Sequence, residues 1–355
     1  MAGIFWAPPR ETYPGSLPDK ADVLVIGGGI AGTSLMHHLA RRRIGAVLVE
    51  ARHLAFGASG RNAGFLLAGV ADCYAEAVRI FGRQKAREVW NITDENHDRM
   101  IEAVAGSEVG HRRLGSATFA SGEEECARLE ESAQLLRDDG FEARWDGTTL
   151  FNPRDGEVDP AALVGALAGR LRASAIREGV EVTEIVPAGS EVSVRAGESE
   201  CLAGVVVLAT NGYTSRLLPQ VKIQPTRAQM LASAPLSKVV CDMPTYSHFG
   251  YRYWRQLRSG ELLIGGWRDT SLETERTYDD HPTDGIQEHL DRKLAEMDGR
   301  AEVTNRWAGT MGFTETGLPL AGPVEGMRNV YTCAGFNGHG MGFAFMTAMQ
   351  LVGML

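Results

Sequence analysis

The hydrophobic pattern near the start of the chain predicts a strand, a helix and a second strand. Residues 22–26 form a short, apolar, β-branched run that ends at glycines, which is typical of a buried strand. Residues 33–43 have helical spacing, because Leu35 and Leu39 fall on one face. Residues 46–49 are a second apolar run. The pattern therefore indicates a β-α-β unit.

Helical and strand-like segments alternate along the rest of the chain. Residues 76–145 are mostly helical and charged, and residues 160–178 predict a helix that is entered through Asp159 and Pro160. Apolar runs predict strands at 180–186, 192–194, 205–208, 222–234, 250–267 and 330–333. Further helices are expected at 283–297 and at the end of the chain. With no internal repeat, this mixture predicts an α/β fold with a sheet-based α+β part interleaved in it.

Composition and charge limit the classes of partner. The chain has 36 basic and 45 acidic residues, a net charge of −9, which argues against nucleic acid but not against a small cationic substrate. Its 5 cysteines are dispersed and lack metal-ligand spacing, so we predict no metal site and a reducing compartment. The first residues do not resemble a signal peptide, and no apolar run approaches the roughly 20 residues of a membrane helix. We therefore expect a cytoplasmic protein without a membrane span.

A glycine-rich turn follows the first predicted strand and carries the spacing G-x-G-x-x-G. Gly27 permits a tight turn, Gly29 lets the backbone approach a pyrophosphate, and Gly32 lets helix and strand pack closely. The N-terminus of the following helix offers N–H groups and a partial positive charge to phosphates. Glu50, at the end of the second strand, can accept hydrogen bonds from ribose hydroxyls. Together these features predict a dinucleotide site, but they do not distinguish FAD from NAD.

Several later motifs resemble one known family in content and order. They are a leading Trp6, GASGRNAG at 57–64, VVVLATNG at 205–212, QPTRAQM at 224–230, YRYWR at 251–255 with GELLIGG at 260–266, RWAG at 306–309, GLPLAG at 317–322 and CAGFNGHGM at 333–341. This series resembles the D-amino acid oxidase superfamily of FAD-dependent oxidoreductases, and within it the gamma-glutamylputrescine oxidoreductase-like branch. The resemblance covers nearly the whole chain.

The resemblance implies a Rossmann-like FAD-binding domain interleaved with a β-sheet substrate domain. The FAD-binding domain would comprise residues 1–75, 155–220 and 308–355, and the substrate domain residues 76–154 and 221–307. The chain lacks a cysteine near residue 317, where some relatives attach flavin, so FAD is expected to be non-covalent. The implied cofactor-binding residues are Gly27, Gly29, Ile30, Ala31, Gly32, Glu50, Ala51, Arg52, Ser59, Arg61, Asn62, Ala63, Gly64, Val186, Ala209, Gly212, Gly338, His339, Gly340 and Met341.

The chain also departs from the family pattern in two places. Arg43 stands where many relatives carry the glycine that ends the first helix, so that helix is expected to run longer. The chain ends at Leu355, inside the predicted final helix, where relatives often continue. We therefore leave open whether the C-terminus is truncated.

We assign the reaction to Tyr253, Arg255 and His339. A guanidinium group can bind a carboxylate with two hydrogen bonds, which makes Arg255 and Arg252 candidates for a substrate carboxylate. Because strand residues of equal parity share a face, Tyr253 and Arg255 point together, opposite Arg252 and Trp254, and we expect the former pair to face the pocket. The alternatives are solvent-facing arginines, core aromatics and a structural hydrogen bond for His339.

The implied activity is oxidation of the carbon–nitrogen bond of a small amine or N-substituted amino acid. A hydride would pass to flavin N5, the imine would hydrolyse, and O2 or another acceptor would reoxidise the flavin. Three alternatives stay open: a dehydrogenase with a quinone or protein acceptor, a flavin-binding subunit of a larger complex, and an NAD-dependent Rossmann dehydrogenase. The substrate, the acceptor and the oligomeric state do not follow from the sequence.

Overall fold

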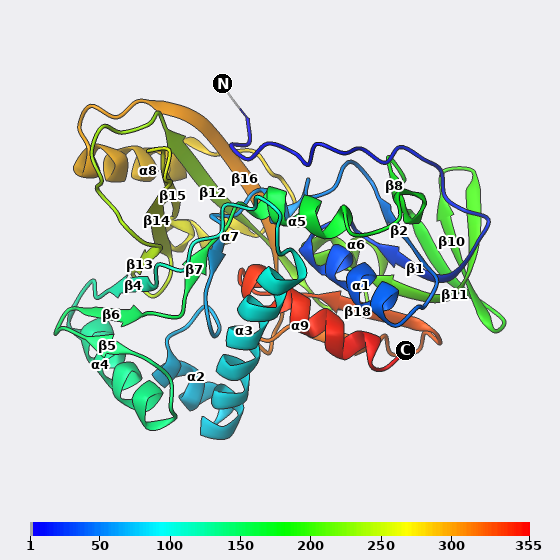
Figure 1. The fold of residues 1–355 in the computed structure, drawn as a ribbon, viewed down its shortest axis with the longest axis horizontal. Coiled ribbons are helices and arrows are strands. Elements are labelled where there is room, and N and C mark those ends of the chain that lie inside the picture. The colour runs from blue at the N-terminus through cyan, green and yellow to red at the C-terminus, as the bar shows by residue number, and fades with distance from the viewer. Residues whose placement is uncertain (1–2) are drawn as a thin grey trace.

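The structure is a computed structural model that describes residues 3–355, and two eight-stranded sheets dominate it (Figure 1). The first sheet has the order β17-β18-β11-β1-β2-β8, with β9 and β10 joined to the edge of β11. Its strands are β1 (Lys20–Ile26), β2 (Ala46–Glu50), β8 (Ile176–Glu178), β9 (Glu184–Ala188), β10 (Glu191–Ala196), β11 (Ser199–Leu208), β17 (Leu320–Pro323) and β18 (Val330–Ala334). The strands β1, β2, β8, β11 and β18 pair in parallel.

Side chains of β1 alternate between two buried cores, because the sheet is covered on both faces. Val23 and Val25 join the core that includes the helices α1 (Ile30–Arg41), α5 (Pro160–Ala168) and α9 (Gly340–Val352). Leu24 and Ile26 join a separate core that includes residues of β9 and β10. This double burial explains why the strands are continuous apolar runs rather than alternating ones. The α/β fold class is confirmed.

The second sheet has the order β16-β12-β15-β14-β13-β4-β6-β5. Its strands are β4 (Ser116–Phe119), β5 (Arg144–Trp145), β6 (Thr149–Asn152), β12 (Gln224–Ser233), β13 (Thr245–Ser247), β14 (Arg252–Gln256), β15 (Leu262–Gly266) and β16 (Val303–Phe313). Leu231, Trp254 and Ile264 pack against Ile286 and Leu290 of α8 (Asp284–Met297), which covers one face. The opposite face is left for a cavity.

The remaining helices are α2 (Tyr74–Phe81), α3 (Arg83–Ala103), α4 (Glu123–Asp138), α6 (Thr214–Leu217) and α7 (Leu272–Glu275). Of these, α2, α3 and α4 lie in the lower part of the view in Figure 1, and α6 lies above α1. A two-stranded sheet pairs β3 (Phe65–Leu66) with β7 (Gly156–Glu157), and short 3-10 turns cover Ala58–Gly60, Ala173–Ala175, Asn211–Tyr213 and Arg268–Thr270. Within residues 3–355, every helix is too short or too polar to cross a bilayer.

Three predicted elements differ from the structure. The helix predicted at 160–178 ends at Ala168, and residues 176–178 instead form β8 beside β2, because sheet pairing and burial of Ile176 outweigh a weak helical preference. The strand predicted at 180–186 begins only at Glu184. The mostly helical stretch 76–145 also contributes the edge strands β4 and β5, whose runs are too short to show a clear period.

The structure also shows where the first and last helices end, the two places at which the sequence departs from the family pattern. Helix α1 ends at Arg41, and Arg43 adopts a left-handed φ of 60°, a conformation usually taken by glycine. The first helix therefore does not run through Arg43. Helix α9 ends at Val352, before the last residue of the chain. The domain boundaries stay a prediction, and β16 runs across the proposed boundary at residue 308.

Candidate active site

A cavity of about 490 Å³ lies between the two sheets. One side is lined by the β1–α1 turn, the end of β2, residues 57–63 and the start of α9. The other side is lined by Ala228 of β12, Tyr253 of β14 and Thr310 of β16. Because both sheets contribute, a ligand here would contact most of the chain's major elements.

The glycine turn is shaped by close backbone contacts. Gly27 has a φ of +114°, and a Cβ there would lie 2.7 Å from the Ala209 carbonyl oxygen. A Cβ on Gly32 would lie 1.8 Å from the Gly27 carbonyl oxygen, so only glycine permits this approach of helix to strand. The N-cap residue of α1, Gly29, has no side chain to cap the helix, and Ser59 Oγ accepts a hydrogen bond from Ile30 N–H at 2.9 Å. The turn thus leaves backbone donors facing the cavity.

Glu50 lies where the sequence places it, at the end of β2 and in the cavity wall. Its carboxylate accepts hydrogen bonds from Gly28 N–H at 2.7 Å and Arg52 N–H at 2.9 Å. Residues 180–182 line the cavity beside it, because Val180 N–H donates to the Glu50 carbonyl at 2.9 Å. The end of β2 and residues 180–182 therefore form one end of the cavity.

Most predicted cofactor-binding residues line this cavity. The residues that do so are Gly27, Gly29, Ile30, Ala31, Glu50, Ala51, Arg52, Ser59, Arg61, Asn62, Ala63, Ala209, Gly338, His339, Gly340 and Met341. The structure brings them together from five separate stretches of chain.

Four predicted residues lie outside the lining. Val186 is 37% exposed on β9, because the chain turns into that hairpin only after residues 180–182 have passed the cavity. Gly32 and Gly212 permit close backbone packing instead, the latter against the Met311 carbonyl. Gly64 has a φ of +74°, and a Cβ there would lie 2.2 Å from the Val158 carbonyl oxygen. These glycines support the wall rather than form it.

The start of α9 brings a partly buried histidine to the other end of the cavity. Gly338, His339 and Gly340 line it, and α9 has no side-chain cap within the described chain. His339 Nδ1 is buried and has no hydrogen-bond partner in residues 3–355. Burial lowers the pKa of His339 to about 4, so the imidazole is neutral at pH 7. An unpaired buried nitrogen here is a feature that a bound ligand would satisfy.

The hairpin arginines differ from the prediction. Tyr253 lines the cavity as expected, and burial raises its pKa to about 12. Arg255 shares its face but is only 2% exposed and lies outside the lining; its Nη1 donates to the Gly64 carbonyl at 2.9 Å, and its guanidinium lies 3.7 Å from Glu157. Arg252 faces away and lies 3.8 Å from Asp269. Neither arginine lines the cavity in this arrangement, because each is packed against or paired with other protein groups.

Arg268 is the arginine that does line this end of the cavity. Strand β15 ends at Gly266, and Trp267 adopts a left-handed φ of 62°, which turns the chain so that Trp267 packs under α8 while Arg268 faces the cavity. The guanidinium lies 4.4 Å from the Tyr251 ring centroid and 5.5 Å from that of Phe313. No carboxylate of residues 3–355 pairs with it, since its neighbour Asp269 pairs with Arg252.

Tyr246 also lines the cavity and was missed from the sequence. It lies on β13, in a stretch without a family motif, and its ring stacks with His339 at a centroid distance of 6.4 Å. Burial raises the pKa of Tyr246 above its ordinary value of 10.0. Arg268 was also missed from the sequence. It lies two residues after the GELLIGG motif at 260–266, and this proximity was the one signal available.

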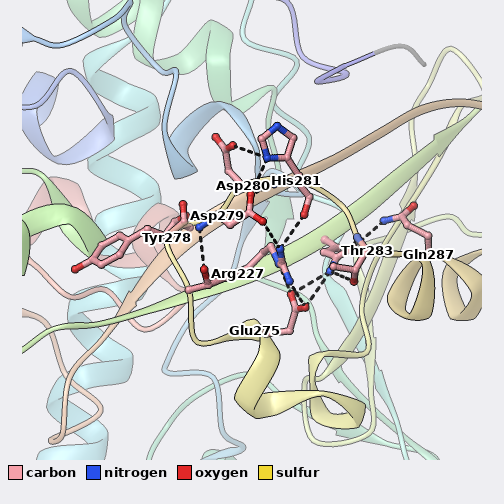
Figure 2. Close-up of polar contacts among 11 residues, drawn as sticks. Arg227, Glu275, Tyr278, Asp279, Asp280, His281, Thr283 and Gln287 are labelled. Carbon is pink, nitrogen blue, oxygen red and sulfur yellow. Dashed lines mark hydrogen bonds and ion pairs between the residues drawn. The ribbon is translucent and has the colours of Figure 1, made fainter.

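A segment of residues 275–283 connects α7 to α8 beside Arg227 of β12 (Figure 2). Arg227 of β12 lies at the centre of its anchor and donates to Glu275 at 2.8 and 2.9 Å, and both side chains are almost fully buried. Gln229 of β12 donates to Thr283 Oγ1 at 2.8 Å. Both ends of the 275–283 segment are therefore fixed to one strand.

The middle of the 275–283 segment contacts the opposite wall. Asp280 pairs with Arg61 at 2.7 Å, and Arg216 lies 4.0 Å from the ring centroid of Tyr278. Tyr278 and Asp280 both line the cavity. Asp279, Asp280 and His281 lie close enough to share a cation, but Asp280 is committed to Arg61 and His281 to Asp279, so we assign no metal to them.

The cavity fits a dinucleotide with a ring system at its far end. The glycine turn, the uncapped N-termini of α1 and α9 and the unpaired His339 Nδ1 offer donors and acceptors along its length. Helix N-termini suit pyrophosphate and developing negative charge. Tyr246 and Tyr253 give the end of the cavity beside α9 an aromatic wall.

Comparisons with known proteins agree with this geometry. The family model described as FAD dependent oxidoreductase matches residues 22–354. The chain is 29% identical to a probable oxidoreductase OrdL of Rhizobium meliloti, over 94% of this chain and 83% of that protein. It is 25% identical to gamma-glutamylputrescine oxidoreductase of Escherichia coli, over 94% and 82%. Its fold matches glycine oxidase from Geobacillus kaustophilus with a TM-score of 0.78, at 21% identity and 95% coverage of both chains.

Proposed function

This chain belongs to the family of FAD-dependent oxidoreductases, and on that premise we propose that it oxidises the carbon–nitrogen bond of a small amine or amino acid. The observation that carries the proposal is the end of the cavity beside α9. There Tyr246, Tyr253 and His339 surround the space, and all three are uncharged at pH 7. Relatives with amine and amino-acid names support the same substrate class.

The residues of this end would bind and orient an uncharged amine. Bound FAD supplies the acceptor for the hydride that leaves the carbon next to nitrogen. The neutral imidazole of His339 can accept a hydrogen bond from the amine, because its low pKa keeps it unprotonated. Burial of this end of the cavity favours the neutral amine, because removal from water disfavours the charged ammonium form. Aromatic walls exclude water and limit the orientations of the substrate.

We propose that Arg268 binds a substrate carboxylate, in place of Arg252 and Arg255. Its guanidinium lies beside two aromatic rings, and it forms no ion pair with an acidic side chain of residues 3–355. A cation without a counter-ion in a cavity wall favours an anionic ligand group. This supports an amino acid or N-substituted amino acid over a simple alkylamine.

We also propose that FAD binds without a covalent bond. The pyrophosphate would lie at the N-terminus of α1, the ribose beside Glu50, and the flavin beside the start of α9. No cysteine is found among the described residues that line the cavity, and Cys333 is buried with its pKa raised to about 12 by burial. A thiol in that state is a poor nucleophile.

Product analysis tests the proposed reaction. FAD-loaded protein would be incubated with amines and amino acids in air and, separately, with an artificial electron acceptor. We expect at least one compound to yield a carbonyl product and a released amine or ammonia in equal amounts. Turnover with the artificial acceptor but not with O2 would assign a dehydrogenase. Failure of every compound under both conditions would contradict the proposal.

A further inference from the structure

A second, smaller chamber of about 80 Å³ adjoins the main cavity. The two share Leu67, Ala71, Tyr246, Gly250 and His339 as lining residues. His339 and Tyr246 thus stand at the junction, and the buried Nδ1 of His339 has no hydrogen-bond partner in the described chain. A molecule held beside His339 could therefore extend one end into the chamber.

Two buried carboxylates line the chamber, and neither has a cationic partner within residues 3–355. Asp155 is 3% exposed and accepts from Ala68 N–H at 2.9 Å and Ser116 Oγ–H at 2.6 Å. Glu125 is 2% exposed and accepts from Phe249 N–H at 2.6 Å and from Ser121. All of these donors are uncharged. Buried charges are costly unless a cation or a metal compensates them, so two such groups in one cavity wall indicate a missing positive charge.

The other charged groups of the chamber do not supply that charge. Arg128 is the one cationic residue of its described lining, and it already pairs with Glu76 at 3.1 Å and Glu124 at 2.8 Å. Asp72 adds a further carboxylate at the wall. Burial also raises the pKa of Asp155 to about 7, the response of a carboxyl group that lacks a compensating cation.

The remaining walls favour an organic cation over a metal ion. Tyr74, Trp90, Tyr246 and Phe249 present aromatic rings, and Leu129 adds an apolar side chain. Aromatic faces attract ammonium groups, and quaternary or methylated ammonium ions are bound in this way. Hard metal cations instead require six or more oxygen ligands, which this wall does not provide.

We propose that the acid-lined chamber binds a distal ammonium or methylated ammonium group of the substrate. The reacting carbon–nitrogen bond would lie in the main cavity, with the alkyl chain passing between His339 and Tyr246. This inference rests on the proposed amine oxidation and adds that the preferred substrate carries a second, cationic nitrogen. Asp155 and Glu125 would be binding residues for that nitrogen and would take no part in the oxidation itself.

Paired ligands test the chamber. Calorimetry under anaerobic conditions would compare the FAD-loaded protein's affinity for diaminobutane, diaminopentane and diaminohexane with that for butylamine, pentylamine and hexylamine. We expect the best diamine to bind at least about 10-fold more tightly than the monoamine of equal length. Asp155→Asn and Glu125→Gln should each reduce that ratio towards one and leave monoamine affinity unchanged. Equal affinities of the matched ligands in the wild type would overturn the inference.

Glu131→Gln is the matched control, because Glu131 is exposed on α4 and outside the chamber lining. It should keep the diamine preference. The flavin spectrum and melting temperature of each variant establish that it is folded; if Asp155→Asn does not fold, Glu125→Gln decides. A diamine preference that survives in folded Asp155→Asn and Glu125→Gln would contradict the assignment. It would also be contradicted if, at equal ionic strength, potassium chloride abolished the preference and methylammonium chloride did not.

Flavin absorbance, recorded during the same anaerobic additions, separates this inference from the proposed function. Diamine preference without any bleaching of the flavin would support the chamber and contradict amine oxidation. Bleaching by diamines and monoamines with equal affinity would support amine oxidation and contradict the chamber.

Discussion

Arg255 lies on β14 and Arg268 in the 3-10 turn that follows the neighbouring strand β15, and the backbone directs Arg268 to the cavity and Arg255 into the core. The left-handed turn at Trp267 exposes Arg268, whereas the passage of Gly64 over β14 encloses Arg255. Strand parity predicts the face of Tyr253 and Arg255 correctly. It does not reveal that Gly64, distant in sequence, covers one of them. The sequence therefore identified Tyr253 and His339 as lining residues, whereas Arg255 lies outside the lining.

Replacement of Arg268 tests its role as a carboxylate-binding residue. We expect Arg268→Met to weaken the binding of amino acids by about 10- to 100-fold, because a charged hydrogen bond contributes about 1.5–3 kcal/mol. Affinity for amines without a carboxylate should change little. Flavin spectral perturbation measures both affinities. Arg276→Gln is the control, since Arg276 is exposed and pairs with Glu273. An equal loss for both ligand classes would show that Arg268 has a general structural role instead.

Asp155 provides a pH-dependent test at the same scale. Burial raises its pKa from 3.8 to about 7, so the folded chain binds this proton more tightly than the unfolded chain. Its contribution to stability is therefore complete below about pH 4 and is lost as the pH rises towards 7. At about pH 8, the free energy of unfolding of Asp155→Asn should exceed that of the wild type by up to about 4 kcal/mol. At about pH 4 the two free energies of unfolding should be similar. Urea denaturation of the ligand-free protein would measure this, and a parallel pH dependence of the two proteins would contradict it.

Elements differ in how far the sequence predicts them. The β1–α1–β2 unit is local, so its apolar period and glycine spacing were sufficient. The 275–283 segment depends on long-range contacts, because Arg227 and Gln229 fix its ends and Arg61 its middle. No local period encodes such contacts. The same limit applies to residues 180–182, whose place beside Glu50 follows from sheet pairing.

The 275–283 segment should retain the cofactor. Asp280→Asn removes the ion pair with Arg61, and we expect FAD to dissociate about 3- to 10-fold faster, as for loss of a partly buried pair of about 1 kcal/mol. The rise of free flavin fluorescence after dilution measures the rate. Glu273→Gln, an exposed change just before the segment, should leave the rate unaltered. Identical rates for Asp280→Asn and wild type would show that the segment does not retain FAD.

At the scale of the whole molecule, the cavity is the product of two sheets that interleave along the chain. Its walls come from the β1–α1 turn, from β12 and β14, and from the start of α9, which no single stretch of sequence predicts together. The glycine turn and the motifs at 57–64, 205–212 and 333–341 nevertheless supply most of the predicted cofactor-binding residues that line the cavity. The substrate end was less predictable, since Tyr246 and Arg268 lie outside those motifs.

Anaerobic titration of the FAD-loaded protein tests the central claim most directly. Amines and amino acids, including those with a second cationic nitrogen, would be added while the flavin absorbance is recorded. Oxidation of a carbon–nitrogen bond predicts that at least one of them bleaches the flavin in a saturable manner, with one substrate molecule consumed per flavin. A flavin that stays oxidised with every amine and amino acid, yet is reduced by dithionite, would contradict the account.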